Sequence, residues 1–425
     1  MSFALGLLPV ALLLLGFPIF LVLLASVSAA LMFFMQIPLP ALHQTLFGAV
    51  DAYALLAVPF FIFAGELMGR GSVAERLVGF VNAGVGSVRG SLAVTTVGSS
   101  ALFGAISGVS AATVATIGRA MLPALRRGGY PDKFSAGLLT AVGAIDIIIP
   151  PSIPMIMYCL AAQQSVPRLY AAGVLPGLLL AGMLCAYVVW YARRNGIGGG
   201  ERFSLAAFWA ATVRGLGALG APVIILGGIY GGVFSPTEAA AVACVYAIAV
   251  AKYVYRELSW RDILASAAAT AVFTGQILII VACASVFGWL LTVNQVPAAM
   301  TAWLTGLDLP SWSLLLCINV LLLVVGCFMD PLSAILLLSP LLVPLVTAIG
   351  VDPVHFGIIV TVNLSIGLFH PPFGINIFVA QSVLKLPLET IYRGIMPFLL
   401  IYLVALGLIT YIPEISLASA RWLLN

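Results

Sequence analysis

Long apolar stretches, separated by short groups of polar residues, run along the chain from one end to the other. Many of them reach the ~20 residues that an α-helix needs to cross the hydrocarbon core of a bilayer. We therefore expect an all-α polytopic membrane protein with on the order of ten to twelve crossings. No stretch is polar enough to form a separate soluble domain, so the function is expected to reside within the membrane.

Helix-breaking residues recur in register between the two halves of the chain. Six prolines and glycines of the first half reappear 221 positions later in the second. We interpret the halves as two structural repeats, 1–190 and 205–425, joined by a polar linker at 191–204. The recurring pairs are Pro123 and Pro344, Gly129 and Gly350, Pro150 and Pro371, Pro151 and Pro372, Gly173 and Gly394, and Pro176 and Pro397.

Each repeat contains the same two interruptions of its apolar pattern. The first predicts a re-entrant helical hairpin, at about 91–128 and again at about 311–350. The second is a double proline, which should break a helix in two because proline lacks the backbone donor and clashes with the preceding turn. These broken helices are expected at about 134–163 and 353–384. Interruptions paired in this way between two halves indicate a transporter binding site.

Composition supports the membrane assignment, and the charges suggest an orientation. Hydrophobic residues make up 63% of the chain and charged residues 8%, whereas soluble domains carry about 25% charged residues. If the two repeats are inverted relative to each other, all 18 Lys and Arg residues except Arg119, Arg168 and Arg421 fall on one face. The positive-inside rule makes that face, including the linker, cytoplasmic.

The chain lacks the sequence motifs of the enzyme classes that we considered. It has no GxxxxGK[ST] phosphate loop, no HExxH and no GxSxG, and its six cysteines form no CxxC pair. We therefore expect neither an enzyme nor a cofactor, and no ATP-driven step within this chain. Uphill transport would have to draw on an ion gradient or on another chain. No run rich in Lys or Arg suggests nucleic-acid binding.

Candidate cation ligands gather at the predicted hairpin tips. Small hydroxyl residues and glycine allow side-chain and carbonyl oxygens to approach a hard cation such as Na⁺. An acid inside an apolar run is costly unless it is paired or bound to a cation. Tight packing of small residues, and helix capping by the acid, remain alternative interpretations. The ion-binding candidates are Ser107, Gly108, Ser110, Thr113, Gly326, Asp330 and Ser333, together with Asp146, which is equally well explained as a locally satisfied carboxylate.

The double prolines and the residues after them are candidates for holding an anionic substrate. Half-helices that begin after the prolines would point their positive dipole ends at the middle of the protein, which suits a carboxylate. Ser152 and Asn376 can donate hydrogen bonds directly. Kinking without a ligand is the alternative. The substrate-binding candidates are Pro151, Ser152, Pro372, Gly374 and Asn376.

Several motifs together resemble one transporter family. They are VPFFIFAGELMGRG (58–71), FGAISGVSAAT (103–113), IIIPPSIPMIMY (147–158) and GIYGGVFSPTEAAAVA (228–243). With the DP and PP pairs of the second half, they look like the large membrane subunit, DctM type, of tripartite ATP-independent periplasmic (TRAP) transporters. The resemblance covers nearly the whole chain. Asp146 departs from the family pattern, which more often has a small residue at that position.

The resemblance implies a multi-pass protein of the bacterial inner membrane that works by an elevator-type movement. It implies sodium-coupled import of an organic acid, such as a C4-dicarboxylate or a sialic acid, delivered by a periplasmic binding protein. A small four-helix membrane subunit is the other implied partner. Family sodium sites map onto Ser107, Gly108, Ser110, Asp330 and Ser333 and onto the residues around Pro151 and Pro372. The nearest alternative is a stand-alone, ion-coupled anion transporter without a binding protein; a channel is a more distant one.

Overall fold

The computed structural model of this chain describes residues 6–35, 39–200, 202–306 and 309–424. These residues form helices and connecting turns, so the expected all-helical, multi-span membrane fold is confirmed. In the described residues, eight helices are long and apolar enough to cross a membrane. This is fewer than the ten to twelve that chain length suggests, because five other apolar helices have only 10–17 residues.

Within the residues that the structure describes, the first half of the chain forms ten α-helices before the polar linker. Helix α10 is much longer than the others and closes this half. The helices are α1 (Leu8–Leu14), α2 (Ile19–Phe34), α3 (Leu39–Val50), α4 (Ala57–Arg70), α5 (Val73–Val85), α6 (Ser91–Ser107), α7 (Ser110–Arg127), α8 (Asp132–Val142), α9 (Ile153–Ala162) and α10 (Val166–Arg194), with short 3-10 segments η2 (Tyr53–Leu56) and η3 (Gly143–Ile147).

The described part of the second half forms another ten α-helices and one short π-helical segment. Two of its helices begin after a serine N-cap: Ser235 and Ser259 each form a reciprocal capping box with an acid three residues later. The elements are α11 (Leu205–Tyr230), α12 (Pro236–Ala249), η4 (Val250–Val254), α13 (Trp260–Val293), α14 (Val296–Thr305), α15 (Ser311–Phe328), α16 (Pro331–Ala348), α17 (Pro353–Gly367), α18 (Ile375–Leu384), α19 (Leu388–Tyr411) and α20 (Glu414–Leu424).

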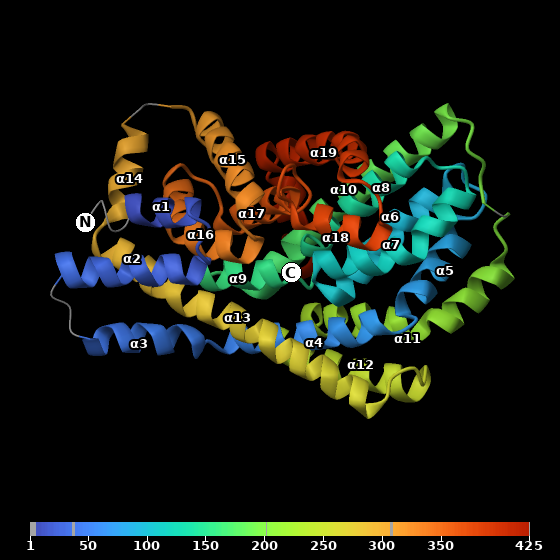
Figure 1. The fold of residues 1–425 in the computed structure, drawn as a ribbon, viewed down its shortest axis with the longest axis horizontal. Helices are drawn as coiled ribbons and strands as arrows, with labels where there is room; N and C mark the ends of the chain where they lie inside the picture. Colours follow the sequence, from blue (N-terminus) through green and yellow to red (C-terminus); the bar gives the residue numbers. More distant parts are fainter. Residues whose placement is uncertain (1–5, 36–38, 201, 307–308, 425) are drawn as a thin grey trace.

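Two helical hairpins approach each other at the centre of the molecule. The α6–α7 hairpin turns at Gly108 and Val109, and Gly108 has a φ of 61°, a left-handed conformation that costs glycine little. The α15–α16 hairpin turns at Met329 and Asp330. Figure 1 shows α15 and α16 to the left of centre and α6 and α7 to the right, with α18 between them.

Each double proline separates two short helices. In the first half, α8 continues into η3 and the chain restarts as α9, whose N-cap is Ser152. In the second half, α17 ends at Gly367 and α18 begins after Gly374. The Pro150–Pro151 and Pro371–Pro372 peptide bonds are both cis.

The two halves pack crosswise around the broken helices. Helix α7 of the first hairpin packs on α18, which belongs to the other half, and α16 of the second hairpin packs on α9. Helices α8 and α19 also pack together, and a methyl group at Gly137 would overlap the backbone of Gly394. The hairpins and broken helices are therefore interlocked and form one central unit.

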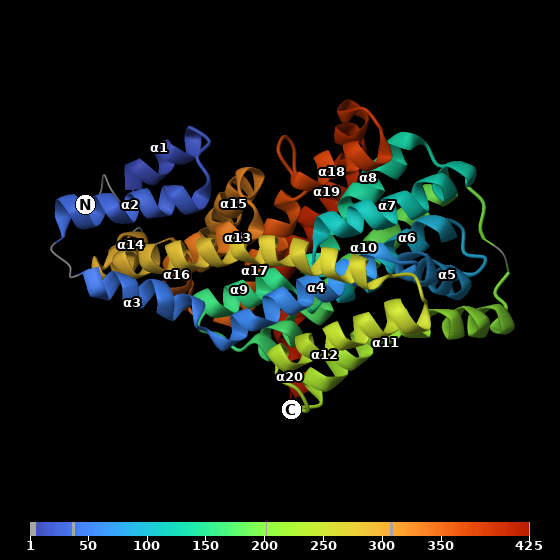
Figure 2. The same cartoon turned by 60° about the horizontal axis from the view of Figure 1, so that its bottom comes forward.

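The remaining long helices lie along the outside of this unit. Helix α13 packs against α2, α3, α4 and α16, while α12 packs on α4 and α11 on α5. Figure 2 shows α13 running along the molecule beside α4, with α11 and α12 on the side where the chain ends. The largest fully buried side chains lie mainly in the central unit and α10 and α19; they include Tyr158, Tyr170, Tyr402, Phe103, Phe356, Phe369 and Phe398.

Candidate functional site

The tip of the α6–α7 hairpin carries two buried serines. Ser107 is the last residue of α6, and its hydroxyl bonds only the adjacent turn, accepting from the Val109 amide at 3.3 Å. Ser110 opens α7 and donates its hydroxyl to the Gly143 carbonyl at 2.7 Å, where α8 passes into η3. The hairpin tip is thereby fastened to the first broken helix.

Asn376, in the first turn of α18, connects this tip to the opposite half of the chain. Its amide nitrogen donates to the Ser110 hydroxyl at 2.8 Å and to the Thr140 carbonyl at 3.4 Å. Asn376 has an exposed fraction of 0%. One side chain thus links the second broken helix to both the first hairpin and the first broken helix.

Asp146 lies on η3, behind the hairpin tip, and has an exposed fraction of 0%. Its Oδ2 accepts a hydrogen bond from the Thr113 hydroxyl, while its Oδ1 has no partner among the described residues. A methyl group at Gly104 would overlap this carboxylate. The first hairpin therefore encloses an acid that is only half satisfied, and a buried carboxylate oxygen of this kind fits a cation ligand.

Asp330 caps helix α16 at the tip of the second hairpin. Its Oδ2 accepts from the Ser333 amide at 3.0 Å and its Oδ1 from the Ser333 hydroxyl at 2.6 Å. Asp330 is exposed, whereas Ser333 is buried. Gly326, near the end of α15, allows the hairpin to lie close to α17, since a methyl group there would stand 3.4 Å from the Gly367 Cα.

Both hairpin tips and both broken helices line one central cavity of about 360 Å³. The hairpins contribute three of the predicted ion ligands, Gly108, Ser110 and Asp330. Apolar side chains cover most of the remaining wall, from the broken helices and from α13. The further lining residues are Val109, Ala111, Ile147, Ile153, Pro154, Phe273, Gln276, Ile277, Ile280, Pro331, Leu332, Leu368 and Ile375.

The other predicted site residues do not line this cavity. Ser152 is fully buried, donating to the Ile147 carbonyl at 2.6 Å and capping α9. Residues outside the lining are Ser107, Thr113, Asp146, Pro151, Ser152, Gly326, Ser333, Pro372, Gly374 and Asn376. Gln276 was missed by the motif-based prediction, although a lone amide within the apolar run of α13 is a usable signal.

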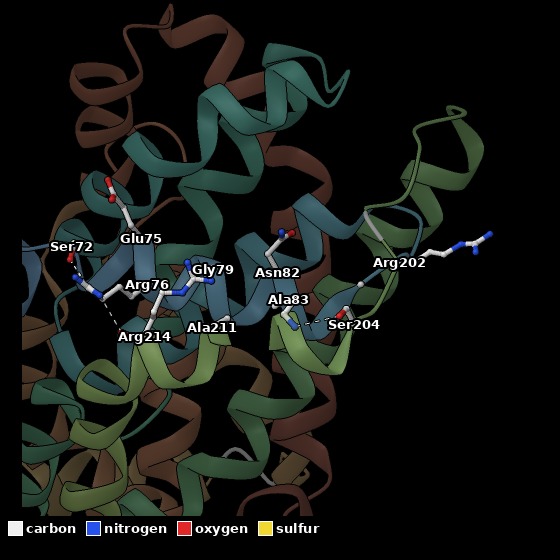
Figure 3. Close-up of a pocket in the computed structure, with 12 residues that line it drawn as sticks. Ser72, Glu75, Arg76, Gly79, Asn82, Ala83, Arg202, Ser204, Ala211 and Arg214 are labelled. Carbon is white, nitrogen blue, oxygen red and sulfur yellow. Dashed lines mark hydrogen bonds between the residues drawn. The ribbon is translucent and has the colours of Figure 1, made fainter. Parts of the chain in front are cut away.

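A separate polar pocket of about 390 Å³ lies between α5 and α11 (Figure 3). Its Arg76 donates to the Ser72 hydroxyl at 2.8 Å and stacks 3.8 Å above the Tyr255 ring. Burial raises the pKa of Glu257, but hydrogen bonds from Ser72 and Arg76 outweigh that effect and leave the pKa lowered. Figure 3 shows Arg202 pointing away from the other lining residues. We interpret these contacts as fastening the segment after α12 to α5.

Comparison with known proteins identifies the family. Residues 7–415 match the DctM family, described as the tripartite ATP-independent periplasmic transporter, DctM component. The chain is 43% identical to the C4-dicarboxylate TRAP transporter large permease protein DctM of Pseudomonas aeruginosa, over 89% of this chain and 88% of that protein. It is 40% identical to the isethionate TRAP transporter permease protein DctMQ of Oleidesulfovibrio alaskensis, over 91% of this chain and 61% of that longer protein.

A solved structure supports the fold independently. The YdaH transporter of Alcanivorax borkumensis superimposes with a TM-score of 0.64 at 16% identity, covering 90% of this chain and 88% of that one. At this identity the likeness concerns the fold alone. The match over residues 7–415 and the high identity to named permeases place the chain: it belongs to the DctM family of large TRAP transporter permease subunits and is a transporter component, not an enzyme.

Proposed function

We propose that this chain is the translocation subunit of a sodium-coupled secondary transporter that imports an organic acid. The observation that carries the proposal is the central cavity, where two hairpin tips and two broken helices meet. Non-helical backbone and half-helix ends at one place are what broken-helix transporters use to bind ions and substrates. The similar DctM and DctMQ permeases are named for C4-dicarboxylates and isethionate, which are both organic anions.

The two acids at the hairpins support cation coupling. Asp330 faces the central cavity, and Asp146 has an oxygen without a partner among the described residues. Around them lie hydroxyl groups of Ser110, Thr113 and Ser333, and oxygen ligands of this kind suit Na⁺. We assign one ion to each hairpin, with the Gly108 and Gly326 backbones completing the ligand sets.

The crosswise packing supports an elevator-type movement of two inverted repeats. The first hairpin and both broken helices are bonded to one another through Ser110 and Asn376, and the second hairpin packs on α9 and α17, so these elements can move together. Helices α2, α4, α11, α12 and α13 lie outside that unit and would form most of the fixed scaffold. The cavity has residues of both parts in its wall, and in this proposal the substrate binds there, at the sliding surface.

We assign the chain to the bacterial inner membrane, with its arginine-rich helix ends in the cytoplasm. Its partners in this proposal are a small four-helix TRAP membrane subunit and a periplasmic substrate-binding protein. The name DctMQ of the longer relative, of which this chain covers 61%, supports a partner that works beside the large subunit.

The test is uptake of radiolabelled succinate and isethionate into proteoliposomes that contain the chain with its small subunit. Uptake should need an inward Na⁺ gradient and the added binding protein, and an equal K⁺ gradient should not replace Na⁺. Uptake that persists without binding protein supports the stand-alone carrier. Electrical flux at channel rates, without competition between substrates, would contradict a coupled carrier of either kind.

A further inference from the structure

A second cavity, of about 450 Å³, adjoins the central one. The two share Val109 and Phe273 in their walls. We call the second cavity the vestibule; it is open on one side, is lined by α4, α7 and α13, and extends from Ser107 at the hairpin tip to Arg70 at the end of α4. It also reaches Arg119, which lies about 13 Å beyond Ser110 along α7 at 1.5 Å per residue.

The vestibule carries one uncompensated positive charge. Of its three ionisable lining residues, Glu66 and Arg70 pair with each other at 2.9 Å and cancel. Arg119 is exposed and donates only its Nε, to the Ala115 carbonyl at 3.1 Å. None of the described residues offers it a carboxylate within ion-pair distance. Most of its guanidinium donors, which can hold both oxygens of one carboxylate, are therefore free.

A buried hydroxyl on the opposite wall also lacks a partner. Thr270 of α13 lines the vestibule with an exposed fraction of 6%, and its Oγ1 has no hydrogen-bond partner among the described residues. An unpaired buried hydroxyl is costly, and an oxygen of a bound molecule would satisfy it. Thr116 adds a further hydroxyl from the same face of α7 as Arg119.

We propose that the vestibule is an inner anion subsite, in which Arg119 binds a carboxylate or other oxyanion of the substrate. The inference rests on the proposed function and deepens it, since it names the group that the substrate meets after the central cavity. The subsite lies toward the ends of α4 and α7 that carry Arg70 and Arg127, the side we assign to the cytoplasm. The central cavity itself is mostly apolar, so Arg119 attracts the anion from the central cavity into the vestibule. Because Arg119 is exposed to solvent, its interaction with the anion is weak and the anion can then dissociate.

The closing experiment measures binding from the inner side with succinate as the probe. Proteoliposomes containing the large and small subunits are loaded with unlabelled succinate or with uncharged succinamide, and uptake of labelled succinate is driven by binding protein and Na⁺. Succinate inside should inhibit the wild-type protein and succinamide should not. In Arg119→Gln the inhibition by internal succinate should weaken about ten- to hundredfold, the usual cost of a hydrogen-bonded charge.

Arg127→Gln is the matched control, because Arg127 is also exposed on α7 and its Nε also donates to the carbonyl four residues earlier. Arg127 does not line the vestibule. Arg127→Gln should keep wild-type inhibition, and Arg119→Lys should fall between the two. The same measurements in liposomes with and without anionic lipid test whether the oxyanion belongs to a lipid head group. If it does, the effect of Arg119→Gln on inhibition will change with the lipid charge, which would contradict a substrate subsite.

Thermal unfolding of the purified complex gives a readout that needs no transport. Succinate should raise the unfolding temperature of the wild-type protein and of Arg127→Gln, and should raise that of Arg119→Gln less. Equal stabilisation of Arg119→Gln, or none in the wild type, would overturn the inner subsite. A wild-type complex that takes up no succinate, yet is stabilised by it through Arg119, would instead contradict the proposed function and leave the subsite standing.

Discussion

At the tip of the first hairpin, hydroxyl and amide groups bond across both halves of the chain, whereas at the second tip Asp330 bonds only within its own helix. Ser110 is held by Asn376 and by the Gly143 carbonyl. Asp330 caps α16 through Ser333 and otherwise faces the cavity. The first tip is therefore built into the central unit, and the second presents an accessible charge.

The helix contacts behind the two hairpin tips also differ. In the first half, Gly104 packs against Asp146, an acid with a free oxygen. In the second half, Gly326 packs against Gly367, which stands 221 positions after Asp146 and has no side chain. The two acids therefore stand at non-equivalent positions: Asp146 is enclosed on η3 behind the first tip, and Asp330 is exposed at the second tip itself. In the proposed function, an enclosed acid would hold the cation at the first hairpin and an exposed acid would hold the cation at the second.

The largest effect is expected when bulk is placed at the first tip. Replacing Ser107 and Ser110 together by Leu should abolish uptake, because the tip joins three segments and lines the cavity wall. Uptake per molecule would be measured after checking that the purified protein is monodisperse. The matched change of both serines to Ala removes the hydroxyls without bulk and should leave a folded chain with weakened Na⁺ dependence. Near-normal uptake by the double Leu variant would mean that the tip serves only helix packing and not transport.

The hydrogen bond from Asn376 to Ser110, which joins the two halves of the chain, should contribute to the thermal stability of the protein. Asn376→Ala removes the hydrogen bonds to the Ser110 hydroxyl and to the Thr140 carbonyl, each worth about 0.5–1.5 kcal/mol. Thermal unfolding of the purified protein should therefore shift down by several degrees. Ser333→Ala at the other tip removes only local bonds and should shift it less. If Ser333→Ala were the more damaging change, the asymmetry between the tips would be wrong.

The two hairpins also differ in how closely the helices behind their tips pack. A Cβ added at Gly104 would lie 2.9 Å from the Asp146 Cα, closer than real contacts allow, whereas at Gly326 its nearest contact is 3.3 Å. We expect Gly104→Ala to lower the free energy of unfolding by about 1–3 kcal/mol. Gly326→Ala should cost less, and equal losses in chemical unfolding experiments would contradict the packing described here.

The exposed acid gives the smallest but most specific effect. Asp330→Asn should raise the Na⁺ concentration for half-maximal uptake about tenfold, or about 1.4 kcal/mol, because the cation loses a charged ligand. Asp352→Asn is the control, since Asp352 likewise caps its helix, α17, but pairs with Arg168 and lies outside the cavity. Unchanged sodium dependence in Asp330→Asn would remove Asp330 from the ion site.

Local chemistry made part of this arrangement predictable. Proline and glycine act on their own backbone, so the double prolines and the turn at Gly108 could be located without knowing any partner. The all-helical class followed from apolar run length alone. The bond between Ser110 and Asn376 could not be found this way, because it joins positions 266 apart through crosswise packing. Gln276 and Arg119 lie outside the repeated motifs, and only the structure places them in cavity walls.

The proposed transport mechanism requires that the central unit of hairpins and broken helices moves past α13. Val109, at the first tip, and Gln276, on α13, face the same cavity from opposite sides of the proposed sliding surface. In a chain whose six cysteines have been replaced, both positions would be changed to Cys and joined by a reducible bifunctional thiosulfonate. Gly118→Cys with Leu384→Cys, in contact within the unit between α7 and α18, provides the control.

Substrate uptake into proteoliposomes is the measurement. We predict that linking positions 109 and 276 stops uptake, that reduction restores it, and that the link between positions 118 and 384 leaves uptake unchanged. Full uptake with positions 109 and 276 joined would contradict the proposed movement.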